Sequence, residues 1–243
     1  MSYIQTFPLK QINRAWQDLL GIFYPRLCLS CDKLLHESEE ILCHLCLSKL
    51  PFSGFGFNQS NPVYELLAKL VKIENASSLF IFHQEGIMQK LIHELKYKGQ
   101  QDIGKLIAQL ACETYKNNTA FSTIDYIVPV PLHKKKLKKR GYNQLSVFGE
   151  NLGNCFGIRY DEKILIKKKN TESQTRKNVE ERRVNVANTF EILNPPLYKS
   201  KHFLIIDDVM TTGATTEACA HTILEQIPES KVSVLTMAVV YHI

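Results

Sequence analysis

The stretch Phe203-Leu-Ile-Ile-Asp-Asp-Val-Met-Thr-Thr-Gly-Ala-Thr215 decides the fold class of this 243-residue chain. Four apolar residues, typical of a buried strand, are followed by two aspartates and then by a Thr/Gly segment that opens a helix. A buried strand that turns through glycine into a helix is half of a βαβ unit. In sheets built of such units, ligands bind beyond the carboxyl ends of the strands.

The segments around this stretch continue the alternation. Strands are expected at residues 78–82, 124–130, 163–166, 203–207 and 232–240, and helices at 11–23, 63–73, 87–97, 103–115, 144–156, 180–186 and 214–226. This order predicts an α/β fold with a mainly parallel sheet flanked by helices. A Gly/Ser/Asn/Pro-rich segment, residues 51–62, marks the boundary between an N-terminal module, residues 1–60, and the α/β domain, residues 61–243.

Composition is that of an ordinary globular protein. Hydrophobic residues make up 44% of the chain, its mean hydropathy is −0.15, and no apolar run approaches the ~18 residues that cross a bilayer. The N-terminus lacks the apolar run and the cleavage site of a signal peptide, so we expect a cytoplasmic protein with no membrane insertion. The formal net charge of +6 is compatible with anionic ligands.

The residues that follow the strand suit a phosphate and a sugar. A helix N-terminus offers unpaired backbone N–H groups, and Gly213 lets a ligand approach the backbone closely. Asp207 and Asp208 only accept hydrogen bonds when ionised, so they suit ribose hydroxyls or a hydrated Mg²⁺. The threonines that add hydroxyl donors are Thr211, Thr212, Thr215 and Thr216. The alternative is a plain helix cap beside two solvated aspartates.

Four of the seven cysteines form two CxxC pairs, Cys28 with Cys31 and Cys43 with Cys46. Two such turns can place four thiolates around one ion, which predicts a closed, structural zinc site. Redox pairs, a buried-thiol cluster and an iron–sulfur cluster are the alternatives. The odd total and the clustering argue against a secreted disulfide framework. The other cysteines, expected to be reduced thiols in apolar surroundings, are Cys112, Cys155 and Cys219.

A basic run follows the strand expected at residues 124–130 and therefore shares a sheet edge with Asp207. It comprises Lys134, Lys135, Lys136, Lys138, Lys139 and Arg140. We interpret it as a loop that binds pyrophosphate or DNA phosphates, although a solvated surface run has the same composition. The polar segment 171–185 is either a mobile lid or a surface loop. Lys96 and Lys98 could reach substrate or only complement a helix C-terminus.

The stretch 203–215 resembles the signature with which type I phosphoribosyltransferases bind phosphoribosyl pyrophosphate (PRPP). The resemblance implies that Asp207 and Asp208 contact the ribose as catalytic residues, with Mg²⁺ bound to the PRPP. The implied PRPP-binding residues are Asp207, Asp208, Val209, Met210, Thr211, Thr212, Gly213, Ala214 and Thr215. We expect the acidic pair to serve ligand binding more than folding, with Asp208 on the hydroxyls because it begins the loop.

Nearly the whole chain resembles the ComF family of competence proteins. The segments that carry the resemblance are Tyr24-Pro25, the two CxxC pairs, Leu95-Lys-Tyr-Lys-Gly99, Pro129-Val-Pro131, Arg140-Gly-Tyr-Asn-Gln144, Ser173-Gln-Thr, Glu181-Arg182, Asn185-Val186 and the PRPP loop. The resemblance implies a type I phosphoribosyltransferase-like domain behind a zinc module. It also implies a role in natural transformation, with single-stranded DNA and a competence helicase or another DNA-processing protein as partners.

Two functions remain open from the sequence. The first is a PRPP-binding protein of the ComF type that handles single-stranded DNA during DNA uptake, with its basic run on the backbone phosphates. The second is an active phosphoribosyltransferase, which would displace pyrophosphate from C1 of PRPP with an unidentified acceptor in nucleotide metabolism. The acidic pair argues for a sugar ligand, because carboxylates would repel a DNA phosphate.

Overall fold

The computed structural model of the chain describes residues 25–168 and 189–241. The chain divides into two compact units, Met1–Leu50 and Pro51–Ile243. The division falls earlier than residue 60 because the start of the second unit pairs with its first strand. The Ser53 N–H donates to Leu79 O (2.9 Å) and the Ile81 N–H donates to Pro51 O (2.8 Å). The helices expected at residues 11–23 and 180–186 and the lid segment 171–185 lie outside the described residues.

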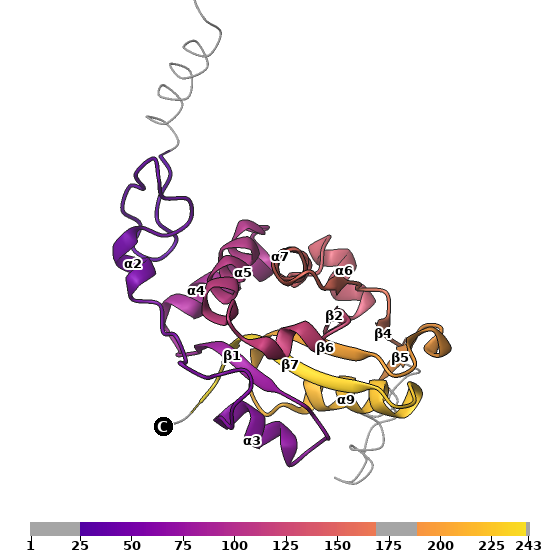
Figure 1. Cartoon of the computed structure of the whole chain (residues 1–243). Helices are drawn as coiled ribbons and strands as arrows, with labels where there is room; N and C mark the ends of the chain where they lie inside the picture. Colours follow the sequence, from indigo (N-terminus) through magenta and orange to yellow (C-terminus); the bar gives the residue numbers. More distant parts are fainter. Residues whose placement is uncertain (1–24, 169–188, 242–243) are drawn as a thin grey trace, which may run out of the picture. The chain divides into compact units, whose positions relative to one another are not determined.

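The second unit is built on a five-stranded parallel sheet of order β1-β7-β6-β2-β3 (Figure 1). The strands are β1 (Ala76–Ile81), β2 (Tyr126–Pro129), β3 (Arg159–Tyr160), β6 (His202–Met210) and β7 (Lys231–Val239). The central strands β6 and β7 are almost wholly buried, which explains their nearly continuous apolar sequences. A separate antiparallel ribbon joins β4 (Leu165–Lys167) to β5 (Phe190–Ile192), and β5 packs against helix α9 (Ala214–Gln226).

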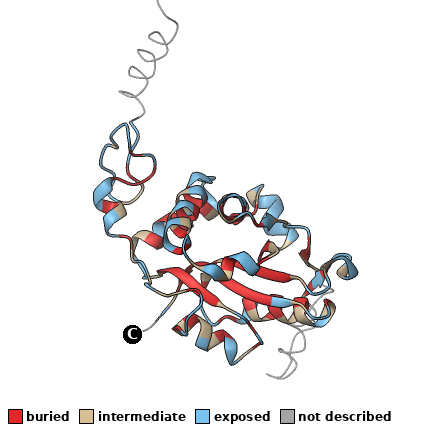
Figure 2. Cartoon of the chain, in the orientation of Figure 1, coloured by how far each residue is buried: buried red, intermediate tan, exposed pale blue. Residues whose placement is uncertain are grey.

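Helices cover both faces of the sheet (Figure 1). On one face lie α4 (Ile87–Tyr97), α5 (Asp102–Tyr115) and α7 (Ser146–Phe156), and on the other lie α3 (Pro62–Ala68) and α9. The apolar positions of α4, α5 and α7 recur at helical spacing and are buried (Figure 2). The predicted fold class, a mainly parallel sheet flanked by helices, is confirmed. None of the described helices combines the length and the apolar character that a bilayer crossing requires.

A difference in strand length opens the edge of the sheet. β2 pairs with β6 only as far as Pro129 opposite Ile206, whereas β7 accompanies β6 to Met210. The last bond of this ladder runs from the Val130 N–H to Ile206 O (2.9 Å), just beyond the end of β2. β6 was expected to end at residue 207, but it runs on through Asp207 and Asp208. The two aspartates are therefore strand residues that β2 does not pair with.

The basic run is a short helix, α6 (Lys134–Arg140), and not the loop expected from the sequence. The His133 ring nitrogen accepts the Lys135 N–H (3.2 Å) at its start, and Gly141 ends it in the left-handed region with φ +82°. Lysine, leucine and arginine favour helices. A run of charged residues has no apolar periodicity, however, so the sequence pattern did not reveal this helix.

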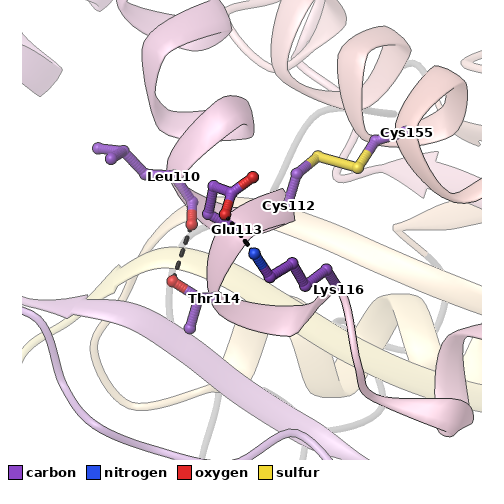
Figure 3. Close-up of a disulfide and its surroundings, with 6 residues drawn as sticks. All are labelled: Leu110, Cys112, Glu113, Thr114, Lys116 and Cys155. Carbon is purple, nitrogen blue, oxygen red and sulfur yellow. Dashed lines mark hydrogen bonds and ion pairs between the residues drawn. A yellow bond between two sulfur atoms is a disulfide. The ribbon is translucent and has the colours of Figure 1, made fainter.

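One disulfide joins two neighbouring helices in the described part of the second unit. Cys112 of α5 and Cys155 of α7 are bonded (Figure 3), with their Cα atoms 6.4 Å apart. The expectation that both are free thiols is wrong for this pair. It considered only neighbours in sequence, whereas 43 residues separate the two cysteines and the packing of α5 on α7 brings them together. Cys219 is a free, buried thiol, as expected.

Candidate functional site

A cavity of about 580 Å³ lies at the carboxyl ends of β2 and β6. The end of α4, the segment that follows β2, helix α6, the β4–β5 ribbon and the end of β6 all contribute to its walls. The charged side chains that line it are Lys96, Lys136, Arg140, Lys167, Asp207 and Asp208. Four cations thus surround two carboxyl groups, an arrangement that suits a ligand with both hydroxyl groups and phosphates.

Asp208 is buried, with only 5% of its surface exposed. One of its carboxylate oxygens accepts a hydrogen bond from Lys96 Nζ at 2.5 Å. The other accepts one from the side-chain amide of Gln144. Asp208 therefore has two side-chain partners within the fold.

The surroundings of Asp207 disfavour the charged form of its carboxyl group. Burial of its carboxyl group, followed by the negative charge of Asp208, raises the pKa of Asp207 to about 7. The backbone N–H of Asp208 donates to Asp207 Oδ1 (2.8 Å) and offsets part of this rise. A carboxyl that titrates near neutral pH can take up or release a proton during a reaction.

Helix α6 turns one stripe of residues toward the cavity. His133, Lys136 and Arg140 are separated by three and four residues, so they lie along one helix face, and all three line the cavity. Arg140 donates to the Gln144 side-chain oxygen, and the Gln144 amide donates to Asp208. The other predicted pyrophosphate- or DNA-binding residues do not line the cavity and are exposed on α6: Lys134, Lys135, Lys138 and Lys139.

The loop after β6 has the backbone that the sequence predicts. Gly213 adopts φ +78° and caps α9, and a Cβ placed there would lie 3.1 Å from Leu67 of α3. The first backbone N–H groups of α9 follow it. Of the predicted PRPP-binding residues, Asp207, Asp208, Val209 and Thr215 line the cavity. Met210 and Gly213 are buried, and Thr211, Thr212 and Ala214 are exposed. Thr216, expected to add a hydroxyl donor, is buried (1% exposed).

The first unit brings all four predicted cysteine ligands together. The sulfur atoms of Cys28, Cys31, Cys43 and Cys46 lie within 4.8 Å of one another. Cys31 Sγ and Cys43 Sγ are 3.7 Å apart. Zn–S bonds of about 2.3 Å in a tetrahedron place sulfurs about 3.8 Å apart, so the donor set fits one such ion. The four cysteines can hold a metal.

Electrostatics at this cluster also fit a cation. Burial alone would raise the pKa of Cys28, but the backbone N–H groups of Cys43, Cys31 and Ser30 more than offset it and lower the value to about 6. Burial, reinforced by the other sulfurs, raises the pKa of Cys46 to about 12. Four thiolates packed this closely therefore need a bound cation to be ionised together.

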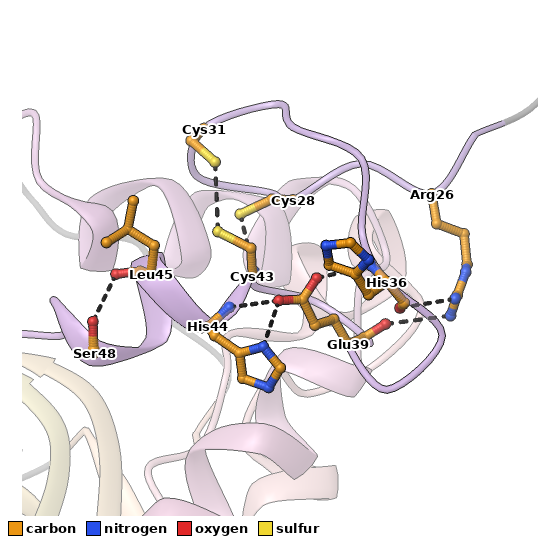
Figure 4. Close-up of polar contacts among 9 residues, drawn as sticks. All are labelled: Arg26, Cys28, Cys31, His36, Glu39, Cys43, His44, Leu45 and Ser48. Atoms are coloured by element: carbon orange, nitrogen blue, oxygen red, sulfur yellow. Dashed lines mark hydrogen bonds and ion pairs between the residues drawn. The ribbon is translucent and has the colours of Figure 1, made fainter.

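A buried carboxylate supports the cysteine cluster (Figure 4). Glu39 is 4% exposed, and its oxygens accept the backbone N–H groups of His36 (2.8 Å) and His44 (2.7 Å). Arg26 donates to the backbone carbonyls of Glu39 (3.3 Å) and His36 (3.2 Å). The His44 ring lies against Glu39 Oε1 (2.9 Å), so it is occupied by this contact. These contacts hold the loop between the two CxxC pairs, and His44 begins helix α2 (His44–Ser48).

Several curated proteins that are similar to the chain are named for competence or DNA utilization. "DNA utilization protein YhgH" of Salmonella typhimurium is 28% identical over 211 residues, which cover 82% of this chain and 91% of that protein. "Competence protein F" of Haemophilus influenzae is 25% identical over 79% of this chain and 88% of its own. "Competence protein ComFC" of Bacillus subtilis is 25% identical over 87% and 83%. The chain is a homologue of the ComF-type competence proteins. No protein-family model matches it.

Solved structures that resemble this ComF homologue include phosphoribosyltransferases. Adenine phosphoribosyltransferase from Leishmania tarentolae aligns with 67% of this chain and 91% of its own, with 12% identity and a TM-score of 0.37. Glutamine PRPP amidotransferase from B. subtilis aligns with 58% of this chain and 30% of its own, with 13% identity and a TM-score of 0.40.

Some cavity residues of this ComF homologue were not assigned from the sequence. Lys96 is now placed, since it reaches Asp208, whereas Lys98 pairs with Glu94 (3.5 Å) at the end of α4. Gln144 could have been assigned from the sequence, because it is the last residue of the ComF-like segment that begins at Arg140. No sequence pattern assigned Lys167 to the site, because the pairing of two three-residue strands brings it to the cavity.

Proposed function

We propose that the cavity binds the phosphoribosyl group of PRPP or of a related ligand, and that this ComF homologue handles single-stranded DNA during DNA uptake. One observation carries the proposal: Asp207 and Asp208 lie where β6 extends beyond β2, with Lys96, Lys136, Arg140 and Lys167 around the same cavity. The carboxylates suit sugar hydroxyls, and the cations suit pyrophosphate.

The elements around the cavity would divide the ligand between them. The N-terminus of α9 and Thr215 would take the 5′-phosphate, since backbone N–H groups and the helix dipole favour an anion there. Asp207 and Asp208 would hold the ribose hydroxyls or a hydrated Mg²⁺, which supplies positive charge against the pyrophosphate when bound. Lys136 and Arg140 would take the pyrophosphate oxygens from α6.

The outer face of α6 supports the DNA side of the proposal. Its exposed lysines point away from the cavity stripe and form a row of positive charge that backbone phosphates could occupy. The relatives named for competence and DNA utilization point to the same ligand. A competence helicase or another DNA-processing protein is the partner proposed for this step, in the cytoplasm.

For the cysteine cluster we propose one structural zinc ion. All four positions of a tetrahedral site are filled by protein sulfurs, so no coordination site is left for a reactive water. Zinc would therefore hold the first unit together and take no part in a reaction at the cavity.

Transferase activity is the second candidate, and Asp207 favours it. A carboxyl with a pKa of about 7 inside a sugar-binding cavity could accept a proton from an attacking nucleophile. Release of pyrophosphate from PRPP, assayed against a panel of nucleobases, distinguishes this activity from binding alone.

Calorimetric titration tests the proposal. PRPP with Mg²⁺ and a single-stranded oligonucleotide are titrated separately and then in competition. We expect both ligands to bind. The affinity for the oligonucleotide should fall when PRPP occupies Lys136 and Arg140. A protein loaded with metal that binds neither ligand would contradict the proposed function.

A further inference from the structure

The cavity also contains an exposed aromatic ring. Tyr97, the last residue of α4, lines the cavity and is 67% exposed. Tyr115, at the end of the next helix, is by contrast a buried tyrosine. It is 3% exposed, and its hydroxyl shares a hydrogen bond with Ser77 (3.0 Å). A ring left in water contributes little to folding. Its place beside a charged cavity therefore suggests a ligand.

The Tyr97 ring is held from several sides. His93, one turn earlier in α4, lies 5.1 Å away between ring centroids. The guanidinium carbon of Arg140 lies over the Tyr97 ring, 5.5 Å from its centroid. The Tyr142 hydroxyl donates to Leu95 O, which fastens the end of α4 to the segment after α6. The ring is thus positioned before any ligand arrives, which reduces the entropy lost on binding.

We infer that Tyr97 is the stacking platform for an unpaired nucleobase whose phosphates lie on Lys136 and Arg140. Every nucleobase has a π-face, so an aromatic ring beside a basic groove binds single strands with little sequence preference. Arg140 already lies over the ring and joins it to the phosphate-binding stripe of α6. The bases of a duplex are stacked on one another, so the ring selects an unpaired base.

The inference rests on the proposed single-strand binding and names the residue that recognises the base. A base within a DNA strand is the favoured source, because the exposed lysines of α6 continue the positive surface beyond the cavity. A free nucleotide offers the same ring chemistry. The two sources differ in whether added nucleotides increase affinity, since only a strand reaches the outer lysines.

The experiment compares three variants of the full chain, Tyr97→Ala, Tyr97→Phe and the control Tyr241→Ala, with the wild type. Tyr241 is also exposed (39%) and does not line the cavity. The probes are oligo-dT, the same strand with abasic sugars, thymidine 5′-phosphate and ribose 5-phosphate. Affinities are measured by fluorescence anisotropy or calorimetry at two salt concentrations, and thermal melts check folding.

We expect Tyr97→Ala to lower the affinity for oligo-dT roughly 5- to 100-fold, the range that the loss of one base–aromatic stack produces. Its affinities for the abasic strand and for ribose 5-phosphate should stay within twofold of the wild type, as should all affinities of Tyr97→Phe and Tyr241→Ala. The loss should persist at higher salt, because stacking releases no counterions.

The outcomes separate the two proposals. If the wild type binds oligo-dT and Tyr97→Ala binds it equally well, the stacking inference is wrong and the proposed function stands. If the wild type prefers oligo-dT no more than the abasic strand, no base is recognised and the inference is again wrong. If thymidine 5′-phosphate binds as tightly as oligo-dT, a free nucleotide is the ligand. A wild type that binds no probe contradicts both proposals.

Discussion

Lys96 Nζ lies 2.5 Å from Asp208 Oδ1, so the end of α4 and the end of β6 are joined by an ion pair inside the candidate site. The Lys96 side chain is 23% exposed and that of Asp208 is 8% exposed. Gln144 holds the second oxygen of the same carboxylate. A sugar or a hydrated cation that binds Asp208 must therefore compete with Lys96 or share the carboxylate with it.

The first prediction concerns this pair. Lys96→Gln leaves Asp208 charged beside Asp207, and Asp208→Asn leaves Lys96 without its partner, so each variant should lower the melting temperature. The double variant should lose less than the sum of the two. The coupling free energy, read from a double-mutant cycle, should be about 0.5–3 kcal/mol.

Ligand binding by the same variants separates folding from function. Asp208→Asn should weaken PRPP–Mg²⁺ by roughly ten- to a hundredfold, since a hydrogen bond to a charged group contributes about 1.5–3 kcal/mol. Lys98→Gln is the matched control, because Lys98 pairs with Glu94 on the surface of α4. Normal PRPP binding by a folded Asp208→Asn protein would show that the acidic pair is structural.

A second prediction follows from the raised pKa of Asp207. Its value is about 7 in the folded chain and about 3.8 in the unfolded chain, so the folded state binds more protons between these values. This carboxyl therefore makes stability fall as the pH rises from about 4 to about 7. Asp207→Asn should melt higher than the wild type at pH 8, and this gain should disappear near pH 4. Thermal melts of both proteins from pH 4 to pH 8 measure this difference in melting temperature. A difference that does not change with pH would contradict the raised pKa of Asp207.

Gly213 gives a third prediction. Alanine there must adopt φ +78°, and its Cβ would lie 3.1 Å from Leu67. Gly157→Ala is the control, because Gly157 has φ +70° with nothing within 4 Å of an added Cβ. Both variants should lose roughly 1 kcal/mol to backbone strain, and Gly213→Ala should lose more through crowding. Thermal melts of the two decide this, and equal losses would show that Leu67 moves aside without cost.

The sequence predicted those elements whose apolar spacing is long and regular. The bounds of α4 are as expected, because its buried face repeats at helical spacing over several turns. The bounds of α9 are also as expected, because the Thr/Gly segment before it marks its start. The strands β3 and β5 were missed, since two or three residues are too few for a pattern to emerge. The extension of β6 through the aspartates depends on its pairing with β7, which local sequence does not encode.

The candidate site was predictable where its residues form one contiguous segment. The loop after β6, for which we propose phosphate binding, and the two CxxC pairs each lie within a few residues, so the sequence spacing alone pointed to them. The contacts of Asp208 with Lys96 and Gln144 span 112 and 64 residues, and the disulfide of Cys112 with Cys155 spans 43. Such pairs form only when helices and strands pack, so one sequence could not reveal them.

A fourth prediction concerns the metal. The purified chain should hold one zinc ion, and Cys28→Ser should abolish binding and unfold the first unit, while the second unit keeps its own melting transition. His36→Gln is the control, because its side chain lies outside the four-sulfur set. Elemental analysis and melts before and after chelation measure both effects. Iron with sulfide, or a reduced and folded chain without metal, would exclude zinc.

The last prediction separates the two faces of α6. Replacing Lys135, Lys138 and Lys139 with glutamine removes exposed charges outside the cavity, whereas Lys136→Gln removes a charge inside it. For a single strand, the slope of log affinity against log salt changes by about 0.7 for each phosphate that the protein no longer neutralises. The triple variant should therefore flatten this slope by up to about 2 and leave PRPP binding unchanged, because its lysines do not line the cavity. Lys136→Gln should lower the affinity for both ligands, since the Lys136 amine lies where pyrophosphate and the strand would compete. Anisotropy titrations from low to moderate salt, paired with calorimetry for PRPP, test both statements.

An unchanged slope in the triple variant would move the DNA-binding surface away from the outer face of α6, and weaker PRPP binding by that variant would show that the two faces do not act separately.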